Sequence, residues 1–315
     1  MRKVRYEYTG TPGDTDVAAG GAYYVRIQVD NTLCADGRHC MKKNGMILKK
    51  HGALEYITAE SFDETGLVRH CFTTRLGGVS EGCYSSLNLG VNRGDDREKV
   101  LKNYDIICEE LGISKEDIIL SRQTHSDTVR EVGRSDCGNG LLRENRFENA
   151  DAFVTNERGA TLTIFMADCV PILFLDPQKR AIAACHSGWR GTVQHIAKKT
   201  LEKMRERFGC IEKDILCAIG PSIGPCCFEV DAPVVREFKA AFDFLPSSEY
   251  IKETGGGKYH IDLWRANFEL LRHTGIPEEN ISLFGECTVC GTEKYFSHRR
   301  DGDARGSLAA MIELI

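Results

Sequence analysis

Residues 161–192 read TLTIFMADCVPILFLDPQKRAIAACHSGWRGT, and this stretch decides the fold. It contains three short apolar segments, Thr161–Met166, Val170–Leu175 and Ala181–His186, which are separated by brief polar turns. Short apolar runs bounded by turns are typical of strands that are buried on both faces. The stretch therefore predicts buried strands joined by short turns.

The rest of the chain mixes strands and helices without a strict βαβ alternation, which favours an α+β fold with a large mixed sheet system. The hydrophobic pattern predicts further strands at Arg69–Thr74, Ile118–Gln123 and Ile215–Ile219. It predicts helices at Arg97–Leu111, Thr192–Phe208, Ala232–Phe242 and Leu263–Thr274. The helix over 192–208 has a good stop signal, because Arg205 and Arg207 near its end are followed by Gly209.

Composition excludes several classes of protein. The 315 residues carry a net charge of −5 with a pI near 6.0, whereas basic nucleic-acid-binding domains usually have a pI above ~9. Asp168 interrupts the longest apolar stretch, Thr161–Leu175, which is shorter than the ~18 residues of a spanning helix. We find no signal peptide and expect a cytoplasmic protein whose fourteen cysteines are reduced, with no membrane or nucleic-acid partner.

Residues 1–50 differ from the rest and are expected to be a loop-like or disordered extension. Gly10–Gly21 is rich in Gly, Asp and Thr and has no periodicity. Cys34, His39 and Cys40 have metal-binding side chains, but we discount them because they lie in this extension. Residues 51–315 form one continuous domain, without a linker or repeat.

Three segments carry residues suited to chemistry, and each ends or joins a predicted strand. The first, SRQTH at 121–125, places Gln123 and His125 on one strand face. The second, MADCVP at 166–171, holds Asp168 and Cys169 in a turn inside the apolar run. The third, AACHSGWRGT at 183–192, ends a strand at His186 before a tight bend and a helix.

Each segment alone has a structural interpretation: a hydrogen-bonded histidine, a capping aspartate beside an inert thiol, and a packed strand–helix junction. Together they offer one thiol, Cys169, and two imidazoles, His125 and His186. Three N/S ligands leave a fourth tetrahedral position for water, as in catalytic zinc sites. Adjacent strand residues face opposite ways, so Cys185 should point into the core if His186 points into a site.

Other polar clusters favour structural roles. Cys226 and Cys227 are expected to be core or rim thiols in a Gly/Pro-rich loop. Cys287 and Cys290 have half of a zinc-ribbon spacing, but the chain has no second Cys-x-x-Cys, so we favour a structural role. The polar cluster Ser297–Asp301 fits a surface ion network and an anion site equally well.

Rival enzyme classes use the same residues. Cys169 could act as the nucleophile of a cysteine hydrolase, with His125 or His186 as its base. A His/Cys site also suits copper-dependent phenol oxidation, but the chain lacks the His-x-His pairs of multicopper oxidases. A protein that binds nucleosides or metal without turnover is a third alternative. Walker A, G-x-G-x-x-G, G-x-S-x-G and H-E-x-x-H motifs are absent.

Eight segments together resemble one family. They are FTTRLGGVS, SSLNLGVNRGDD, RQTHSDTV, ADAFVT, ADCVPILFLD, HSGWRGT, IGPSIGPCCFEV and FSHRRDG. In this order they resemble the laccase-domain family, long labelled polyphenol oxidase and now regarded as purine nucleoside phosphorylases. The resemblance runs from about Leu54 to the C-terminus.

The resemblance implies a single domain of mixed sheets flanked by helices, with zinc held by His125, Cys169 and His186. It implies phosphorolysis of adenosine, inosine, guanosine and methylthioadenosine, with phosphate as co-substrate, and deamination of adenosine. Two positions depart from the family pattern: Asn92 replaces a frequent His, and Ser307 replaces a frequent Arg.

Given that chemistry, roles can be assigned to further residues. We expect Arg190 and Arg75 to orient phosphate, because guanidinium groups bind phosphate oxygens in pairs. Asp168 is expected to hydrogen-bond a ligand histidine or to bind substrate. Gln123 and Asn88 are expected to line the base or ribose pocket.

Overall fold

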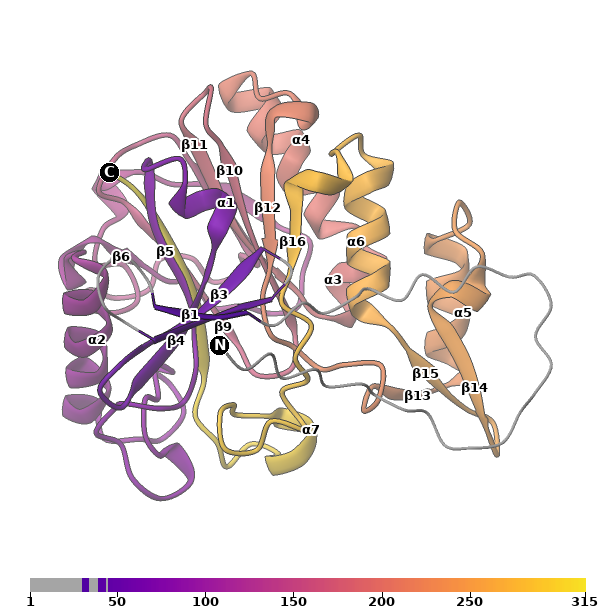
Figure 1. Cartoon of the computed structure of the whole chain (residues 1–315), viewed down its shortest axis with the longest axis horizontal. Coiled ribbons are helices and arrows are strands. Elements are labelled where there is room, and N and C mark those ends of the chain that lie inside the picture. The colour runs from indigo at the N-terminus through magenta and orange to yellow at the C-terminus, as the bar shows by residue number, and fades with distance from the viewer. Residues whose placement is uncertain (1–29, 34–38, 44) are drawn as a thin grey trace.

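Two large β-sheets pack face to face, and helices cover their outer faces (Figure 1). The structure is a computed structural model and describes residues 30–33, 39–43 and 45–315. The architecture is mixed α+β in a single domain, as the sequence predicts. No helix in the described part of the chain has both the length and the apolar character needed to cross a membrane.

The first sheet has eight strands, and the C-terminal strand lies inside it. Its order is β1 (Asp30–Leu33), β2 (His39–Lys43), β3 (Met46–His51), β4 (Leu54–Ala59), β5 (Val68–Thr73), β17 (Leu308–Leu314), β9 (Thr161–Met166) and β6 (Ile118–Ile119). Strand β17 is antiparallel to both of its neighbours, β5 and β9. Ala310 and Ile312 face the second sheet, whereas Ala309 and Met311 face helix α2 (Arg97–Leu111), so both faces of the strand are buried.

The second sheet has six strands, and the hairpin β10–β11 forms its centre. Its order is β16 (Ile281–Leu283), β12 (Leu216–Ile219), β10 (Val170–Asp176), β11 (Ala181–Ser187), β8 (Ala152–Thr155) and β7 (Val129–Glu131). Ile172 and Phe174 of β10 face the helical layer, whereas Leu173 and Leu175 face the first sheet. Each Å² of buried apolar surface stabilises the fold by about 25 cal/mol. This hairpin buries apolar side chains on both faces and therefore lies at the centre of the core.

Helices complete the outer layers. The outer face of the six-stranded sheet is covered by α4 (Ile196–Phe208) and α6 (Leu263–His273), with α3 (Trp189–Val193) beside them. A small third sheet, of order β13 (Glu229–Asp231), β15 (Lys258–Ile261) and β14 (Ile251–Gly255), projects from one side with α5 (Ala232–Ala241) (Figure 1). Two short helices, α1 (Glu60–Asp63) and α7 (His298–Asp301), lie in connecting segments.

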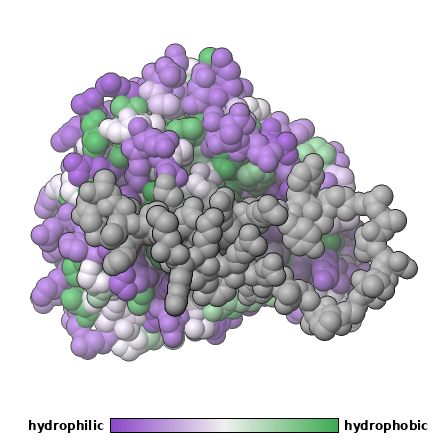
Figure 2. Space-filling view, in the orientation of Figure 1, coloured by the Kyte–Doolittle hydropathy of each residue, from purple (hydrophilic) through white to green (hydrophobic). Residues whose placement is uncertain are grey.

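Little of the apolar content reaches the surface. Hydrophilic side chains dominate the coloured part of the face in Figure 2, with small apolar areas between them. Among the described residues, the exposed large hydrophobic side chains are those of Leu142, Ile211 and Ile315. The sheets and helices therefore bury nearly all their large apolar groups against one another.

The predicted strand over 161–166 and the predicted helix over 97–111 have the bounds of β9 and α2. The strand expected at 118–123 is wrong beyond Ile119, so Gln123 and His125 do not share a strand face. The helix expected at 192–208 is two helices, because His195 has a φ of 58° and interrupts the helical path. Its C-terminus is as predicted, since Gly209 adopts the left-handed conformation there.

Strand β2 and most of strand β3 lie within residues 1–50, which were expected to be a loop-like or disordered extension. Met46 and Ile47 of β3 are buried and pair with β4, so the sheet reaches into the stretch that was expected to be an extension. Much of residues 1–50 lies outside the described residues, including Cys34, and the side chains of His39 and Cys40 are not described either.

A buried histidine makes the fold sensitive to acid. His70 on β5 is buried, and its Nε2 accepts a hydrogen bond from the Ala59 N–H at 2.7 Å, which requires an unprotonated Nε2. Burial lowers the pKa of His70 to about 4; Asp63 opposes this shift and Lys49 adds to it.

We expect the free energy of unfolding to fall as the pH drops from about 6.5 to 4. The unfolded chain binds a proton at His70 in this range and the folded chain does not, which amounts to about 2 kcal/mol at pH 5. Urea unfolding at pH 7.5 and pH 5 checks this, with His70→Gln losing less stability than the wild type. The exposed His51→Gln serves as the control, and an equal pH dependence in wild type and His70→Gln contradicts the prediction.

Candidate active site

A cavity of about 1090 Å³ opens at one edge of the two packed sheets. Its lining includes the turn between β9 and β10, the end of β11, the loop that follows β6, and residues 298–307 near the C-terminus. Because the strands are buried along their length, polar side chains reach this cavity only where the strands end.

Three metal-type donor groups meet in the cavity. His125 lies in the loop after β6, Cys169 follows β9 in the turn to β10, and His186 lies near the end of β11. Their donor atoms all lie within 4.8 Å of one another, and the Cys169 Sγ is 3.7 Å from the His125 Nε2. The tertiary structure thus brings together the three residues singled out in the sequence.

Strand β11 explains why a histidine and not the neighbouring cysteine reaches the site. Cys185 lies on the side of the sheet that faces the helices, where it is fully buried. His186 points the other way and lines the cavity. The predicted opposite orientation of these two residues is confirmed.

Asp151 is the carboxylate that orients this site. It is fully buried just before β8, and its Oδ1 lies 2.8 Å from the His186 Nδ1. This contact leaves the His186 Nε2 as the nitrogen available to a ligand. The same carboxylate accepts hydrogen bonds from the backbone N–H groups of Thr124, His125 and Ser126. It therefore fixes both histidines.

The partners of Asp151 lower its pKa by more than burial raises it. Burial alone would raise the pKa of Asp151, but His186 and Ser126 lower it to about 2. Sequence reasoning did not single out this residue. Its signal was a carboxylate placed directly before the apolar strand AFVT, where an unpaired charge would be costly.

Cys169 and His186 form an electrostatically coupled pair. Burial would raise the pKa of the Cys169 thiol, but His186 and His125 lower it to about 6. Burial would lower the pKa of His186, but Cys169 and Asp151 raise it. The site thus stabilises a thiolate, which is the form that binds metals.

The backbone leaves room for an ion beside these donors. A Cβ atom on Gly188 would lie 2.9 Å from the Cys169 Sγ and 2.9 Å from the His125 Cδ2. Only glycine lets the segment after β11 approach Cys169 and His125 this closely. Two imidazoles and one thiolate suit a divalent transition metal, and the cavity leaves further coordination positions open.

Asp168 does not hydrogen-bond a ligand histidine, which was one of its two expected roles. It has a φ of 89°, and its carboxylate accepts hydrogen bonds from the Thr288 Oγ1 at 2.6 Å, the Ser297 Oγ at 3.0 Å and the Arg299 N–H at 2.6 Å. The histidine partner in this site is Asp151 instead. Asp168 lines the cavity, yet its hydrogen bonds tie the β9–β10 turn to the C-terminal segments.

The cluster Ser297–Asp301 is an internal network with one edge on the cavity. Ser297 caps α7, and the Arg300 guanidinium pairs with Asp301 and donates to the Tyr295 carbonyl. Arg299 and His298 line the cavity.

Of the four residues expected to bind substrate, two line the cavity. Gln123 does so, but its side-chain amide is paired with the backbone of Phe165 in both directions. Arg190 also does so, with its guanidinium 4.3 Å from the Trp189 ring centre.

The other two, Arg75 and Asn88, are not among the residues that line the cavity. Arg75 donates to the Ser85 carbonyl and packs over Phe296. Asn88 is fully buried and is hydrogen-bonded to Asp95. Both side chains hold loops in place, because their polar atoms already have partners inside the protein.

Sequence reasoning missed a buried arginine in the cavity. Arg305 is 6% exposed, and its Nε has no hydrogen-bond partner among the described residues. Burial, and after it the nearby Arg93, lowers the pKa of Arg305 to about 10. Ser307 stands where an arginine is frequent in the family, and Arg305 lies two positions before it. Residues two apart on an extended segment point the same way, so Arg305 could have been recognised as a candidate for the same role.

The fold and site define a single-domain α+β protein with a His/Cys/His donor set in an open cavity. The chain belongs to the family described as "Multi-copper polyphenol oxidoreductase laccase", whose pattern it matches over residues 69–315. This match confirms the resemblance expected from the motifs.

Relatives carry more specific names. The chain is 38% identical to a purine nucleoside phosphorylase of Bacteroides thetaiotaomicron, over 80% of this chain and 94% of that protein. It is 37% identical to adenosine deaminase RL5 of an unknown prokaryotic organism, over 73% of this chain and 88% of that protein. The crystal structure of hypothetical protein YfiH of Bacillus licheniformis has a TM-score of 0.79 at 31% identity, over 84% of this chain and 98% of that one.

Asp151→Asn is expected to weaken metal binding by about 10- to 100-fold, because the amide keeps the shape but loses the charge that holds the His186 ring. Competition against a chromophoric chelator measures this affinity. Asp127→Asn is the matched control, since Asp127 lies on the loop that carries His125 and pairs with Lys199 at the surface. Equal affinities in Asp151→Asn and wild type would contradict the role of Asp151.

Proposed function

We propose that this protein is a zinc-dependent purine nucleoside phosphorylase that also deaminates adenosine. The observation that carries the proposal is the convergence of His125, Cys169 and His186 at the wall of one large cavity. The names of two relatives support it, since one is a purine nucleoside phosphorylase and the other an adenosine deaminase.

The donor set favours zinc. Zinc accepts imidazole and thiolate ligands together, and three protein ligands with an open fourth position are typical of its catalytic sites. His125, Cys169 and His186 would hold the zinc ion, which would supply a Lewis acid at the cavity wall. Asp151 keeps the His186 ring in place for this, and Gly188 keeps the space beside the donors free.

The cationic side of the cavity suits phosphate. Arg305 is buried, and its Nε has no hydrogen-bond partner within the described part of the chain. Arg93 lies close enough to affect its pKa, and Arg190 lies on the same cavity. Two guanidinium groups that repel each other are stabilised when an anion binds between them. We assign phosphate to the region of Arg305 and Arg93, with Arg190 as a further candidate.

In phosphorolysis the nucleophile is phosphate and not a side chain, so the main task of the protein is to position phosphate and nucleoside. A phosphate oxygen attacks C1′ of the ribose, the glycosidic C–N bond breaks, and the base leaves with that electron pair and takes up a proton. Trp189 and Phe228 line the cavity, and a purine would stack on the ring faces that Arg190 and Arg299 leave uncovered. The arginines would hold the phosphate while these rings hold the base.

Deamination uses the same site without phosphate. Water adds at C6 of adenosine, and the amino group leaves as ammonia to give inosine. The relative named adenosine deaminase RL5 favours this second activity.

Two alternatives use the same donors. A cysteine hydrolase would use Cys169 as the nucleophile and His125, 3.7 Å away, as its base. A copper-dependent polyphenol oxidase would match the description of the family. Elemental analysis and the reactivity of Cys169 separate these from the zinc enzyme, because a thiolate bound to zinc resists alkylation until the metal is removed.

We expect Cys169→Ser and His125→Ala each to lose one zinc per chain and to lose phosphorolysis by more than about 100-fold, because each removes a metal ligand. Elemental mass spectrometry gives the zinc content, and chromatography follows adenine formed from adenosine and phosphate. The exposed Cys83→Ser is the control. Zinc loss with full phosphorolysis would contradict the proposed mechanism.

Arg305→Gln is expected to raise the KM for phosphate by about 10- to 100-fold, the effect of losing a charged hydrogen bond. Adenosine deamination, which needs no phosphate, should change far less. Initial rates at varied phosphate, together with inosine formation in its absence, measure both effects. The exposed Arg130→Gln is the matched control. A similar loss of both activities would place Arg305 in general support of the site and not in phosphate binding.

A further inference from the structure

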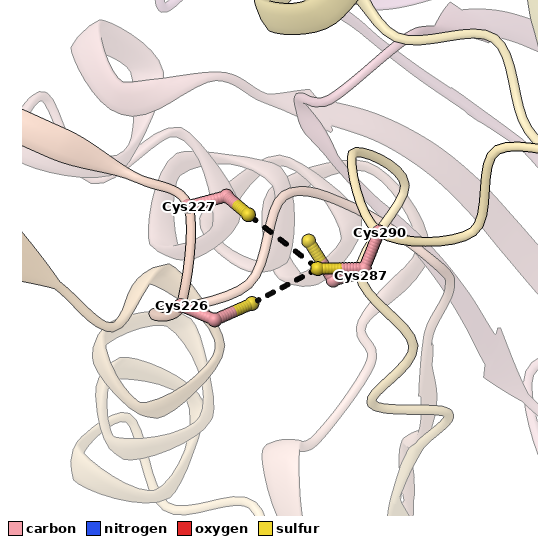
Figure 3. Close-up of side chains that lie close together, drawn as sticks. All are labelled: Cys226, Cys227, Cys287 and Cys290. Atoms are coloured by element: carbon pink, nitrogen blue, oxygen red, sulfur yellow. Dashed lines mark hydrogen bonds between the residues drawn. The ribbon is translucent and has the colours of Figure 1, made fainter.

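Four cysteine thiols meet at a second place, outside the His/Cys/His site. Cys226 and Cys227 come from the loop after β12, and Cys287 and Cys290 come from the loop after β16 (Figure 3). All four sulfur atoms lie within 4.8 Å of one another. Sequence reasoning favoured a structural role over metal binding for Cys287 and Cys290, because the chain has no second Cys-x-x-Cys. In the structure their partners are an adjacent pair, Cys226 and Cys227.

We infer that these four thiolates bind one zinc ion in a closed, structural site. A Zn–S bond of about 2.3 Å places the sulfurs of a tetrahedral site about 3.8 Å apart. The Cys290 Sγ lies 3.6 Å from the Cys226 Sγ and 3.5 Å from the Cys227 Sγ. These separations are close to the edge of such a tetrahedron and far longer than a disulfide bond of about 2.05 Å.

Backbone hydrogen bonds hold the two cysteine-bearing loops together without any contribution from the thiols. Strands β12 and β16 are parallel neighbours, so their loops leave the same edge of the sheet. The pairing continues into the loops, where the Thr288 N–H donates to the Ser222 carbonyl at 3.0 Å. The Gly224 N–H points at the Cys287 Sγ at 3.2 Å, a contact that favours a thiolate.

The sulfur spacing favours a single ion over a larger centre. An iron–sulfur cluster places several iron and sulfide atoms between its thiolates and would hold them farther apart. Four protein thiolates also leave no open position, so this ion would have a structural role, unlike an ion at the cavity.

The proposed ion would fix one wall of the cavity. Thr288, between Cys287 and Cys290, donates to the Asp168 carboxylate, and Asp168 precedes the donor Cys169. The Arg299 guanidinium donates to the Cys227 carbonyl at 3.0 Å and lines the cavity. Joining the two loops through four sulfurs would therefore stabilise the segments that hold Asp168 and Arg299.

Elemental mass spectrometry of the full chain, purified under reducing conditions without added metal, tests this inference. We expect two zinc ions per chain in wild type and in the control Cys83→Ser. We expect one in Cys290→Ser and one in Cys169→Ser, which retain different sites. Cys290 is exposed, so its substitution leaves no buried cavity. A wild type with one zinc, lost in Cys169→Ser and kept in Cys290→Ser, overturns the second site while leaving the first intact.

Alkylation of the wild-type protein provides a test that does not depend on a variant. Cys226, Cys227, Cys287 and Cys290 should resist alkylation until a strong chelator is added, whereas Cys83 should react in both conditions. Mass spectrometry of the digested protein assigns each modified residue. Rapid alkylation without chelator, or disulfides among these four cysteines in metal-free protein, overturns the inference.

Discussion

The burial of both faces of the central strands is the constraint on which the site depends. Strands β10 and β11 face helices on one side and the other sheet on the opposite side, so their interior positions accept only apolar or small side chains. Polar chemistry is thereby restricted to the strand ends. Cys169 and His186 lie at two strand ends, and both line the cavity.

Two buried carboxylates connect this edge to the rest of the chain. Asp151 binds His186 and the backbone of the loop that carries His125, so a single side chain aligns donors from a strand and from a separate loop. Asp168 binds Thr288 and Ser297 and thereby joins the turn at Cys169 to the C-terminal segments. Each carboxylate is tolerated in the interior because several donors satisfy its oxygens. Their roles are complementary: Asp151 orients donors, whereas Asp168 positions the wall beside them.

The two clusters of metal-type donors differ in ways that imply different tasks. The first mixes two imidazoles with one thiolate and faces a cavity with cationic and aromatic lining. The second consists of four thiols from two loops and is complete without a solvent ligand. The number of protein ligands distinguishes catalytic metal sites from structural ones, since an open coordination position admits a substrate and a filled one does not.

The sequence by itself determined the strand β9, the helix α2, the opposite directions of Cys185 and His186, and the donors of the cavity site. These follow from local rules of periodicity and from residue chemistry, which need no partner. Only the tertiary structure decided that β17 lies between β5 and β9, that Asp151 supports His186, and that the loops after β12 and β16 bring four thiols together. The physical reason is that sheet order, hydrogen-bond partners and convergence join residues far apart in the chain, and no local pattern encodes those distances.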